Sequence, residues 1–455
     1  MNEPYSYSHK DNEFIAWYPL RLAAEHSENV WHPKRAGYYV HIPFCTAICD
    51  YCGFAVEKIK GAGVERYLSA LQSEIERYAR SGRLANHNFV CGHFGGGTPS
   101  AISGSDLVAI KTLIDKSFNV QADAEVTVEV NPISFTLDKA QAYKSAGINR
   151  ISFGVQSFND TMLATIGRPH RAKDVGETLD VIHRVGWDNY SIDLIYGIPG
   201  QTLEDVREDL VKAIAIAPAH ISSFRLEIIP LTVLKLREAA NLLPPRPSIS
   251  LLNEMDDLVS TTLTENGYLG YGAFNFARPG FESVHNSIAF MAPQGEYVGF
   301  GNSAYSFSNG YIYCNYADLD DYEQAVFDGK DPIALATPVN ALEMMSRFFV
   351  LGLKFFRVSR VHFETQFGIP AEQIFGDVLT KLYSEGLLIV DGTDYVLTAK
   401  GRRYVNNVVK EFFVGENCGK RQYHQFVSNL TVEQIMRFSE LQARTNEQTH
   451  AETTP

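Results

Sequence analysis

The stretch HIPFCTAICDYCGF, residues 41–54, contains Cys45, Cys49 and Cys52 in a CxxxCxxC spacing. Cysteine thiolates are the usual protein ligands of iron–sulfur clusters. A structural zinc site commonly has four closed ligands, often as two CxxC pairs, and no fourth Cys or His stands at that spacing here. Three thiolates leave one iron of a four-iron cluster open to a small molecule. We therefore expect these cysteines to hold a [4Fe–4S] cluster.

The other cysteines, Cys91, Cys314 and Cys418, are scattered along a chain of 455 residues. Disulfide-stapled domains are short, secreted and dense in cysteine, and this chain has only six cysteines. The first residues, MNEPYSYSHKDNEF, lack a basic segment followed by an apolar one, so we expect no secretory signal. These features favour a cytoplasmic protein with a metal site.

The segments after the cysteine loop alternate between strand and helix patterns. Such alternation is typical of a parallel sheet whose strands are joined by helices. In barrels of this kind, active residues lie at the carboxyl ends of the strands. Strands are expected at residues 38–42, 89–94, 125–130, 150–155, 189–194 and 220–226, and helices at 63–80, 106–118, 137–146, 172–185 and 203–216.

The stretch LLPPRP, residues 242–247, marks a change of organisation. A helix is expected at residues 250–266, within a Gly- and aromatic-rich region. Near the C-terminus, helices at 343–356 and 377–386 with strands at 387–390 and 395–397 indicate a winged-helix-like module. We therefore expect an N-terminal arm (1–35), a partial barrel (36–245), an accessory region completing the active site (246–335), the C-terminal module (336–410) and a tail (411–455).

The formal net charge of the chain is −13. Binding to a phosphate backbone needs clustered Lys and Arg, and the sequence contains no basic stripe. No apolar run approaches the roughly 18 residues that a membrane span needs. We therefore expect neither a nucleic acid nor a membrane as partner.

The CxxxCxxC loop, preceded by Tyr39-Val40-His41-Ile42-Pro43-Phe44, resembles the radical S-adenosylmethionine (SAM) superfamily in its HemN/HemW-like branch. That branch contains oxygen-independent coproporphyrinogen III dehydrogenase, the heme chaperone HemW and the class C radical SAM methyltransferases, including anaerobilin synthases. The resemblance covers roughly residues 36–410. It implies an α/β fold with a partial (β/α)6 TIM-like barrel, a [4Fe–4S] cluster, and SAM that is cleaved reductively to a 5′-deoxyadenosyl radical.

The resemblance also implies which residues contact SAM. Taken singly, a glycine-rich turn or a polar residue at a strand end is as well explained by ordinary barrel structure. Their common position at strand ends favours a ligand site. Some family members hold two SAM molecules, and the implied contacts are Tyr39, Tyr51, Gly96, Gly97, Thr98, Glu129, Gln156, Arg168, Asp193 and, more loosely, Tyr305.

Two positions depart from particular members of the branch. The dehydrogenase has a fourth cysteine two residues after the third, where this chain has Phe54. Heme chaperones carry HNxxYW, of which His285 and Asn286 remain while Ala289 and Phe290 replace the Tyr and Trp. His285 fits a heme ligand, a proton shuttle or a hydrogen-bonded structural histidine.

These observations lead to one main expectation and two alternatives. The main one is a class C methyltransferase that uses a second SAM on a tetrapyrrole or polyketide-like small molecule, with Tyr39 and His285 as catalytic residues. The alternatives are coproporphyrinogen III dehydrogenase and a heme chaperone of the HemW type. A reducing partner such as flavodoxin or ferredoxin is expected to supply the electron.

Overall fold

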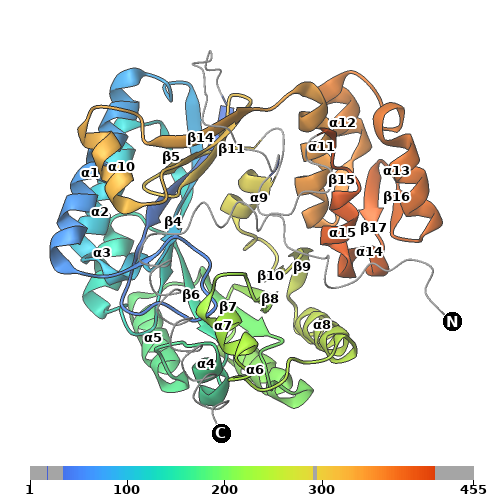
Figure 1. Cartoon of the computed structure of the whole chain (residues 1–455), viewed down its shortest axis with the longest axis horizontal. Coiled ribbons are helices and arrows are strands. Elements are labelled where there is room, and N and C mark those ends of the chain that lie inside the picture. The colour runs from blue at the N-terminus through green and yellow to red at the C-terminus, as the bar shows by residue number, and fades with distance from the viewer. Residues whose placement is uncertain (1–17, 19–33, 291–294, 416–455) are drawn as a thin grey trace, which may run out of the picture.

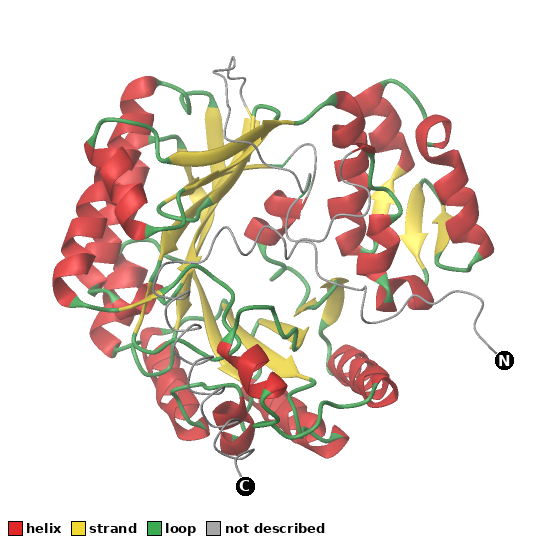
Figure 2. Cartoon of the chain, in the orientation of Figure 1, coloured by secondary structure: helices red, strands yellow, loops and turns green. Residues whose placement is uncertain are grey.

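The computed structural model describes residue 18 and residues 34–290 and 295–415 (Figure 1). Most of the expected N-terminal arm and of the expected tail lies outside these residues. The described chain forms one large curved sheet, with helices along its outer face and a separate module beside its open side (Figure 2). In the described part of the chain, no helix has both the length and the apolar character to cross a bilayer.

The centre of the sheet is the parallel sheet that the alternation predicts, and it forms the partial (β/α)6 barrel that the family resemblance implies. Its six strands are neighbours in chain order and all parallel. They are β1 (Lys34–Ile42), β4 (His87–Gly96), β5 (Val120–Val130), β6 (Arg150–Gln156), β7 (Tyr190–Tyr196) and β8 (His220–Arg225). The outer helices are α1 (Gly61–Ser81), α2 (Gly104–Ser117), α3 (Leu137–Ser145), α4 (Asp160–Thr165), α5 (Ala172–Val185) and α6 (Leu203–Ile216).

The region after the barrel extends this sheet at both edges, which the sequence pattern did not predict. On one side β11 runs parallel to β1, and three antiparallel strands follow. On the other side β10 and β9 continue from β8 in antiparallel pairs. The elements are α7 (Val233–Ala239), α8 (Ile249–Glu265), β9 (Leu269–Gly272), β10 (Asn275–Ala277), α9 (Val284–Phe290), β11 (Glu296–Phe300), β12 (Tyr305–Ser308), β13 (Tyr311–Asn315), α10 (Leu319–Phe327) and β14 (Ile333–Pro338).

The C-terminal module has its own three-stranded sheet, in the order β15-β17-β16, packed on helices. Its core includes Phe307 and Ile312 of the large sheet as well as Tyr18, so the module is joined to the sheet edge by apolar contact. The expected helix at 343–356 changes after Gly352 into a 3-10 turn, Leu353–Phe355, which ends at Phe356 with a left-handed backbone at φ 67°. The elements are α11 (Ala341–Gly352), β15 (Arg357–Ser359), α12 (Arg360–Phe367), α13 (Glu372–Ser384), β16 (Leu388–Asp391), β17 (Asp394–Leu397), α14 (Ala399–Arg403) and α15 (Val405–Lys410).

The domain boundaries stay predictions, but two features bear on where they should be drawn. Strand β1 begins at Lys34, inside the expected arm. Phe412, inside the expected tail, is fully buried and its ring stacks on Phe349 at 4.3 Å. Both segments therefore belong to the folded body, the first through its strand pairing with β4 and the second through burial in the core of the C-terminal module.

Close packing between β1 and β4 gives a test of this fold. A Cβ placed on Gly92 of β4 would lie 2.0 Å from Cζ of Tyr38, a fully buried side chain of β1. We expect Gly92→Ala to destabilise the protein by about 1–3 kcal/mol, because the Tyr38 ring has to shift within a packed core.

The matched control is Gly176→Ala on the exposed face of α5, where an added Cβ meets nothing within 4 Å. Alanine is a better helix former than glycine by about 1 kcal/mol, so this variant should unfold at the same or a higher temperature. Thermal unfolding of both variants checks the prediction. A midpoint for Gly92→Ala equal to that of the parent would show that the strands do not pack as described.

Candidate functional site

The cysteine loop follows β1 and is closed at its base by a short parallel pair, β2 (Phe44–Cys45) and β3 (Glu57–Lys58). The amide of Glu57 donates to the carbonyl of Pro43 at 2.8 Å, and the amide of Ile59 donates to the carbonyl of Cys45 at 2.9 Å. The two ends of the loop are therefore fixed to each other. This arrangement holds the three cysteines over the carboxyl ends of the barrel strands.

Cys45, Cys49 and Cys52 all line one cavity of about 2290 Å³. Burial raises the pKa of Cys45 to about 11, and burial together with the neighbouring thiols raises the pKa of Cys52 further. Thiols in such a place ionise readily only when a metal supplies the compensating positive charge. Arg168 adds a hydrogen bond to Sγ of Cys49 at 3.3 Å. The three residues therefore fit the thiolate ligands of a cluster.

No group of three or more His, Cys, Asp or Glu side chains in residues 34–290 and 295–415 lies close enough to hold a single metal ion. This finding does not bear on a cluster, because the three thiolates of a [4Fe–4S] site each bind a different iron. The ligand assignment of Cys45, Cys49 and Cys52 stays a prediction.

The turn Gly96-Gly97-Thr98 packs directly against the cysteine loop. The amide of Gly97 donates to the carbonyl of Ile42 at 2.8 Å, and the amide of Thr98 donates to the carbonyl of Phe44 at 2.9 Å. Thr98 Oγ1 lies 3.4 Å from Cys45 Sγ. The amides of Gly97 and Thr98 therefore already donate to the cysteine loop. The turn lines the cavity, and it would contact SAM through its other atoms.

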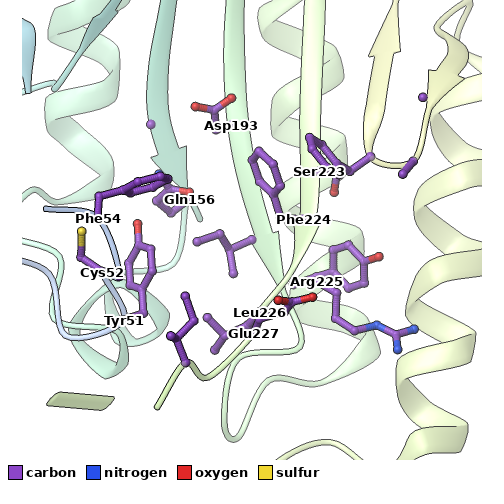
Figure 3. A pocket seen from close by; sticks show the side chains of 18 of the residues that line it. Tyr51, Cys52, Phe54, Gln156, Asp193, Ser223, Phe224, Arg225, Leu226 and Glu227 are labelled. Atoms are coloured by element: carbon purple, nitrogen blue, oxygen red, sulfur yellow. The ribbon is translucent and has the colours of Figure 1, made fainter. Parts of the chain in front are cut away.

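Glu129 lies next to the end of β5, Gln156 ends β6 and Asp193 lies in the middle of β7. All three line the cavity, and Gln156 and Asp193 are seen in Figure 3. Burial, and then the nearby Glu129, raise the pKa of Asp193 to about 7. Gln156 has a left-handed backbone at φ 65°, and its buried Oε1 has no hydrogen-bond partner within the described chain. A strained backbone and an unpaired buried oxygen together are typical of a ligand site. The structure therefore brings these predicted residues together.

The remaining predicted contacts surround the same space. Arg168 is held by a bond to the carbonyl of Gly154 at 2.8 Å as well as to Cys49. Tyr39 shares a hydrogen bond with Nδ1 of His41 at 3.0 Å. Tyr51 and Tyr305 also line the cavity, Tyr51 beside the cysteines and Tyr305 on the accessory strand β12. Their contacts with SAM stay predictions.

His285 lies on α9, a short helix on the inner face of the sheet. Its ring stacks on His93 at 4.7 Å and is tilted against Tyr39 at 6.5 Å. Burial, and then His93, lower the pKa of His285 well below its usual value. Its Nδ1 is buried without a partner among the described residues. His285 therefore lines the cavity as a neutral imidazole.

His93 was missed at the level of sequence, although its Nε2 lies 2.8 Å from Oε1 of Glu129. Its register partner on β1 is Tyr39, so both side chains point to the inner face. The signal was present in the two-residue period of β4, which places His93 on the same face as Gly95 just before the glycine turn.

Two further parts of the cavity lining come from Phe54 and from the C-terminal module. Phe54, where the dehydrogenase has a cysteine, is 62% exposed and lies beside Tyr51 and Cys52 (Figure 3). The C-terminal module contributes Arg402, whose guanidinium lies 4.9 Å from the centre of the Phe356 ring. Of the departures from HNxxYW, Ala289 lines the cavity, while the side chain of Phe290 lies outside the described residues.

Comparison with known proteins agrees with this geometry. Residues 39–213 match the radical SAM superfamily, and residues 339–404 match the HemN C-terminal domain. The chain is 33% identical to the heme chaperone HemW of Bacillus subtilis, over 83% of this chain and 99% of that protein. It is 28% identical to the oxygen-independent coproporphyrinogen III oxidase of Escherichia coli, over 83% and 85%. The structure of coproporphyrinogen III oxidase (HemN) from Escherichia coli superposes with a TM-score of 0.76 at 25% identity, covering 86% of this chain and 95% of that one.

The cluster assignment can be tested by metal content. Anaerobic reconstitution of the parent protein should give about four irons per chain, as a [4Fe–4S] site requires. Alanine at Cys45, Cys49 or Cys52 should abolish this uptake, because each removes a ligand. Cys91→Ala and Cys314→Ala are matched controls in buried positions and should keep the iron. Loss of the cluster in Cys91→Ala would contradict the assignment.

The SAM contacts can be tested separately from the cluster. Glu129→Ala, Gln156→Ala and Asp193→Ala should weaken SAM binding or reductive cleavage by tenfold or more, roughly the loss of one hydrogen bond to a charged group. Their iron content should stay at the parent value. Glu204→Ala on the exposed surface of α6 is the control. The contacts are refuted if all three variants cleave SAM at the parent rate.

Proposed function

Because this chain belongs to the radical SAM superfamily, in the branch that contains HemW and coproporphyrinogen III oxidase, we propose that it cleaves SAM beside Cys45, Cys49 and Cys52 and handles a tetrapyrrole in the adjoining cavity. The observation that carries the proposal is the single cavity that joins the cysteine loop to the C-terminal module. Both the SAM-binding candidates and a large apolar wall face this one space.

Cys45, Cys49 and Cys52 would hold the cluster, which when bound would supply the electron that breaks the sulfonium of SAM, drawn from a reducing partner such as flavodoxin or ferredoxin. The side chains of this protein orient SAM for that step. Glu129 and Asp193 offer carboxylates to its amine and ribose hydroxyls, and Gln156 offers its unpaired Oε1. Fixing the sulfonium in this way lowers the barrier through orientation. A second SAM, with Tyr305 as a contact, stays a prediction.

The size and chemistry of the cavity suit a tetrapyrrole. Its volume of about 2290 Å³ exceeds the roughly 300–1,000 Å³ of ordinary small-molecule sites, which leaves room for SAM and a macrocycle together. Phe224 and Phe274 pack 4.5 Å apart in its wall and, with Phe54, provide aromatic surface for a flat ring system.

The rim of the cavity is suited to the carboxylates that tetrapyrroles carry. Arg246 and Lys235 both pair with one carboxylate, that of Glu238. On the other side, Arg402 is exposed and stacks on Phe356. Positive charge thus exceeds negative charge at these points of the rim, although the chain as a whole carries a net charge of −13. An anionic group of the substrate would find charge-assisted partners here.

Within the branch, we propose that the tetrapyrrole is heme, bound as in the HemW relatives, rather than coproporphyrinogen III. This choice between the two substrates rests on Phe54. The dehydrogenase has a thiol at this position, whereas a phenyl ring neither ligates metal nor transfers a proton. His285 is the candidate ligand of the heme iron. The methyl transfer expected from the sequence finds no support in the heme chaperone and coproporphyrinogen III oxidase relatives named above.

Spectroscopy with purified, reconstituted protein tests this proposal. Heme should bind at one per chain with a shifted Soret band, and His285→Ala should weaken that binding or alter the band, because it removes the candidate ligand. Coproporphyrinogen III should not be converted to protoporphyrinogen IX. His183→Ala, at an exposed histidine of α5 that does not line the cavity, is the matched control and should bind heme with the parent spectrum.

Labelled SAM distinguishes the other outcomes. Cleavage to 5′-deoxyadenosine and methionine with stable heme is the expected result. Accumulation of S-adenosylhomocysteine during turnover of heme would instead establish methyl transfer. Conversion of coproporphyrinogen III would establish the dehydrogenase and refute the argument from Phe54.

A further inference from the structure

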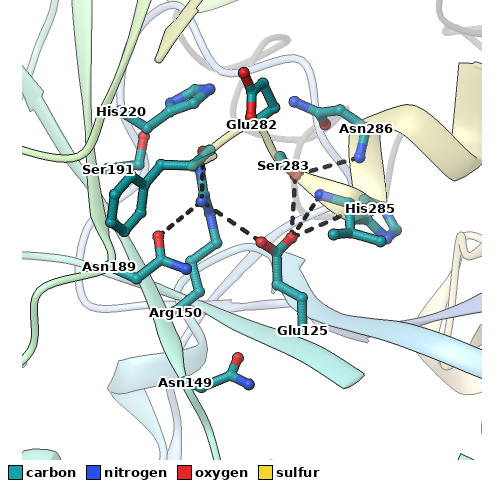
Figure 4. Close-up of polar contacts among 12 residues, drawn as sticks. Glu125, Asn149, Arg150, Asn189, Ser191, His220, Glu282, Ser283, His285 and Asn286 are labelled. Atoms are coloured by element: carbon teal, nitrogen blue, oxygen red, sulfur yellow. Dashed lines mark hydrogen bonds and ion pairs between the residues drawn. The ribbon is translucent and has the colours of Figure 1, made fainter. Parts of the chain in front are cut away.

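A buried ion pair lies inside the barrel, on the same inner strands as the site but nearer their amino ends. It joins Glu125 of β5 to Arg150 at the start of β6, with 3.6 Å between Oε2 and the guanidinium (Figure 4). The two side chains are 10% and 2% exposed. Burying charges costs more free energy than an ion pair of this length returns. The remaining bonds of these two residues show what the pair holds.

The bonds of Glu125 go to the first turn of α9. Its Oε1 accepts from the backbone amide of Val284 at 2.8 Å, and lies 3.5 Å from both the amide of His285 and the hydroxyl of Ser283. A carboxylate at the amino end of a helix satisfies amides that have no partner inside the helix. Glu125 therefore holds α9 from a neighbouring strand.

Arg150 holds the segment that leads into α9. It donates to the carbonyl of Phe281 at 3.1 Å and to Oδ1 of Asn189 at 2.8 Å. Tyr271 gives a further attachment, because its hydroxyl accepts from the amide of Ser283 at 3.1 Å. The start of α9 is thus fixed to β5, β6 and the strand β9.

The position of α9 decides the position of His285. Val284 and Ile288 pack on Val90 and Cys91 of β4, which sets the rotation of the helix. In that rotation the His285 ring stacks on His93 at 4.7 Å. His93 in turn bonds Glu129, a predicted SAM contact. A continuous set of contacts therefore runs from the buried ion pair to the SAM side of the cavity.

We propose that Glu125 and Arg150 are positioning residues, which hold the first turn of α9 and thereby place His285 against His93 at the wall of the cavity. Only the heme part of this inference rests on the proposed function, in which His285 is the candidate ligand of the heme iron. The placement itself is a property of the polypeptide and can be measured without any ligand.

The ligand-free test uses hydrogen exchange and chemical modification. In Glu125→Ala, amide exchange of residues 283–287 and the rate of carbethoxylation of His285 should each rise by about tenfold or more, because one hydrogen bond to a charged group contributes about 1.5–3 kcal/mol. Glu125→Gln keeps an oxygen acceptor and should recover most of the protection. Unchanged exchange and modification rates in Glu125→Ala would overturn the proposal.

The matched control is Glu282→Ala in the same segment (Figure 4). The Glu282 carboxylate accepts from the nearby amide of Gly280 at 3.0 Å. This variant should leave both rates at the parent value. If Glu125→Ala fails to fold, Val284→Pro replaces it. Proline is tolerated at the first position of a helix and removes the amide that Glu125 binds while leaving the ion pair in place, so it should raise both rates as well.

A double-mutant cycle then relates placement to heme. Glu125→Ala should lower heme affinity about tenfold, and adding it to His285→Ala should cause no further loss, because both changes act through one imidazole. Additive losses would show that Glu125 acts on heme by another route and would overturn the positioning role. If His285→Ala binds heme like the parent, the proposed function is wrong, while the exchange and modification rates still decide the placement.

Discussion

Two backbone hydrogen bonds between the cysteine loop and the glycine turn fix the position of the loop at which we propose that SAM is cleaved. The amides of Gly97 and Thr98 donate to the carbonyls of Ile42 and Phe44. The approach is so close that a Cβ on Gly97 would lie 2.8 Å from the carbonyl carbon of Pro43. Because β1 and β4 are parallel neighbours, their carboxyl ends meet at one edge, and the cysteines lie there with the other strand-end side chains.

The barrel is incomplete, and this makes its cavity large. Instead of closing on itself, the parallel sheet continues from β1 into β11 and from β8 into β10. The C-terminal module shares an apolar core with β12 and β13, and Arg402 and Phe356 from this module line the open side of the cavity. A closed eight-stranded barrel fills its interior with side chains, whereas this arrangement leaves space for a cofactor and a large substrate together.

The polar groups inside the barrel lie at two heights along the strands, and one helix, α9, connects the two. Glu129, next to the end of β5, and Asp193, in the middle of β7, line the cavity, while Glu125 and Arg150 lie nearer the amino ends of their strands. Helix α9 connects these heights, because its first turn binds Glu125 and its His285 lines the cavity. A buried ion pair is weak evidence for stability, and here its bonds instead fix the direction of a helix.

The sequence by itself determined the barrel strands, the outer helices except α4, and the loop that carries Cys45, Cys49 and Cys52, because hydrophobic periodicity and cysteine spacing are properties of neighbouring residues. It did not predict strands such as β9 and β12, each only four residues long, since these become strands only by pairing with an existing sheet edge. The roles of His93 and Glu125 were also missed, because the partners of these side chains lie far away in the sequence. The bond of His93 to Glu129 spans 36 positions, and that of Glu125 to the His285 amide spans 160. Contacts between residues so distant in the chain form only after folding has brought their strands together, so tertiary structure alone decided them.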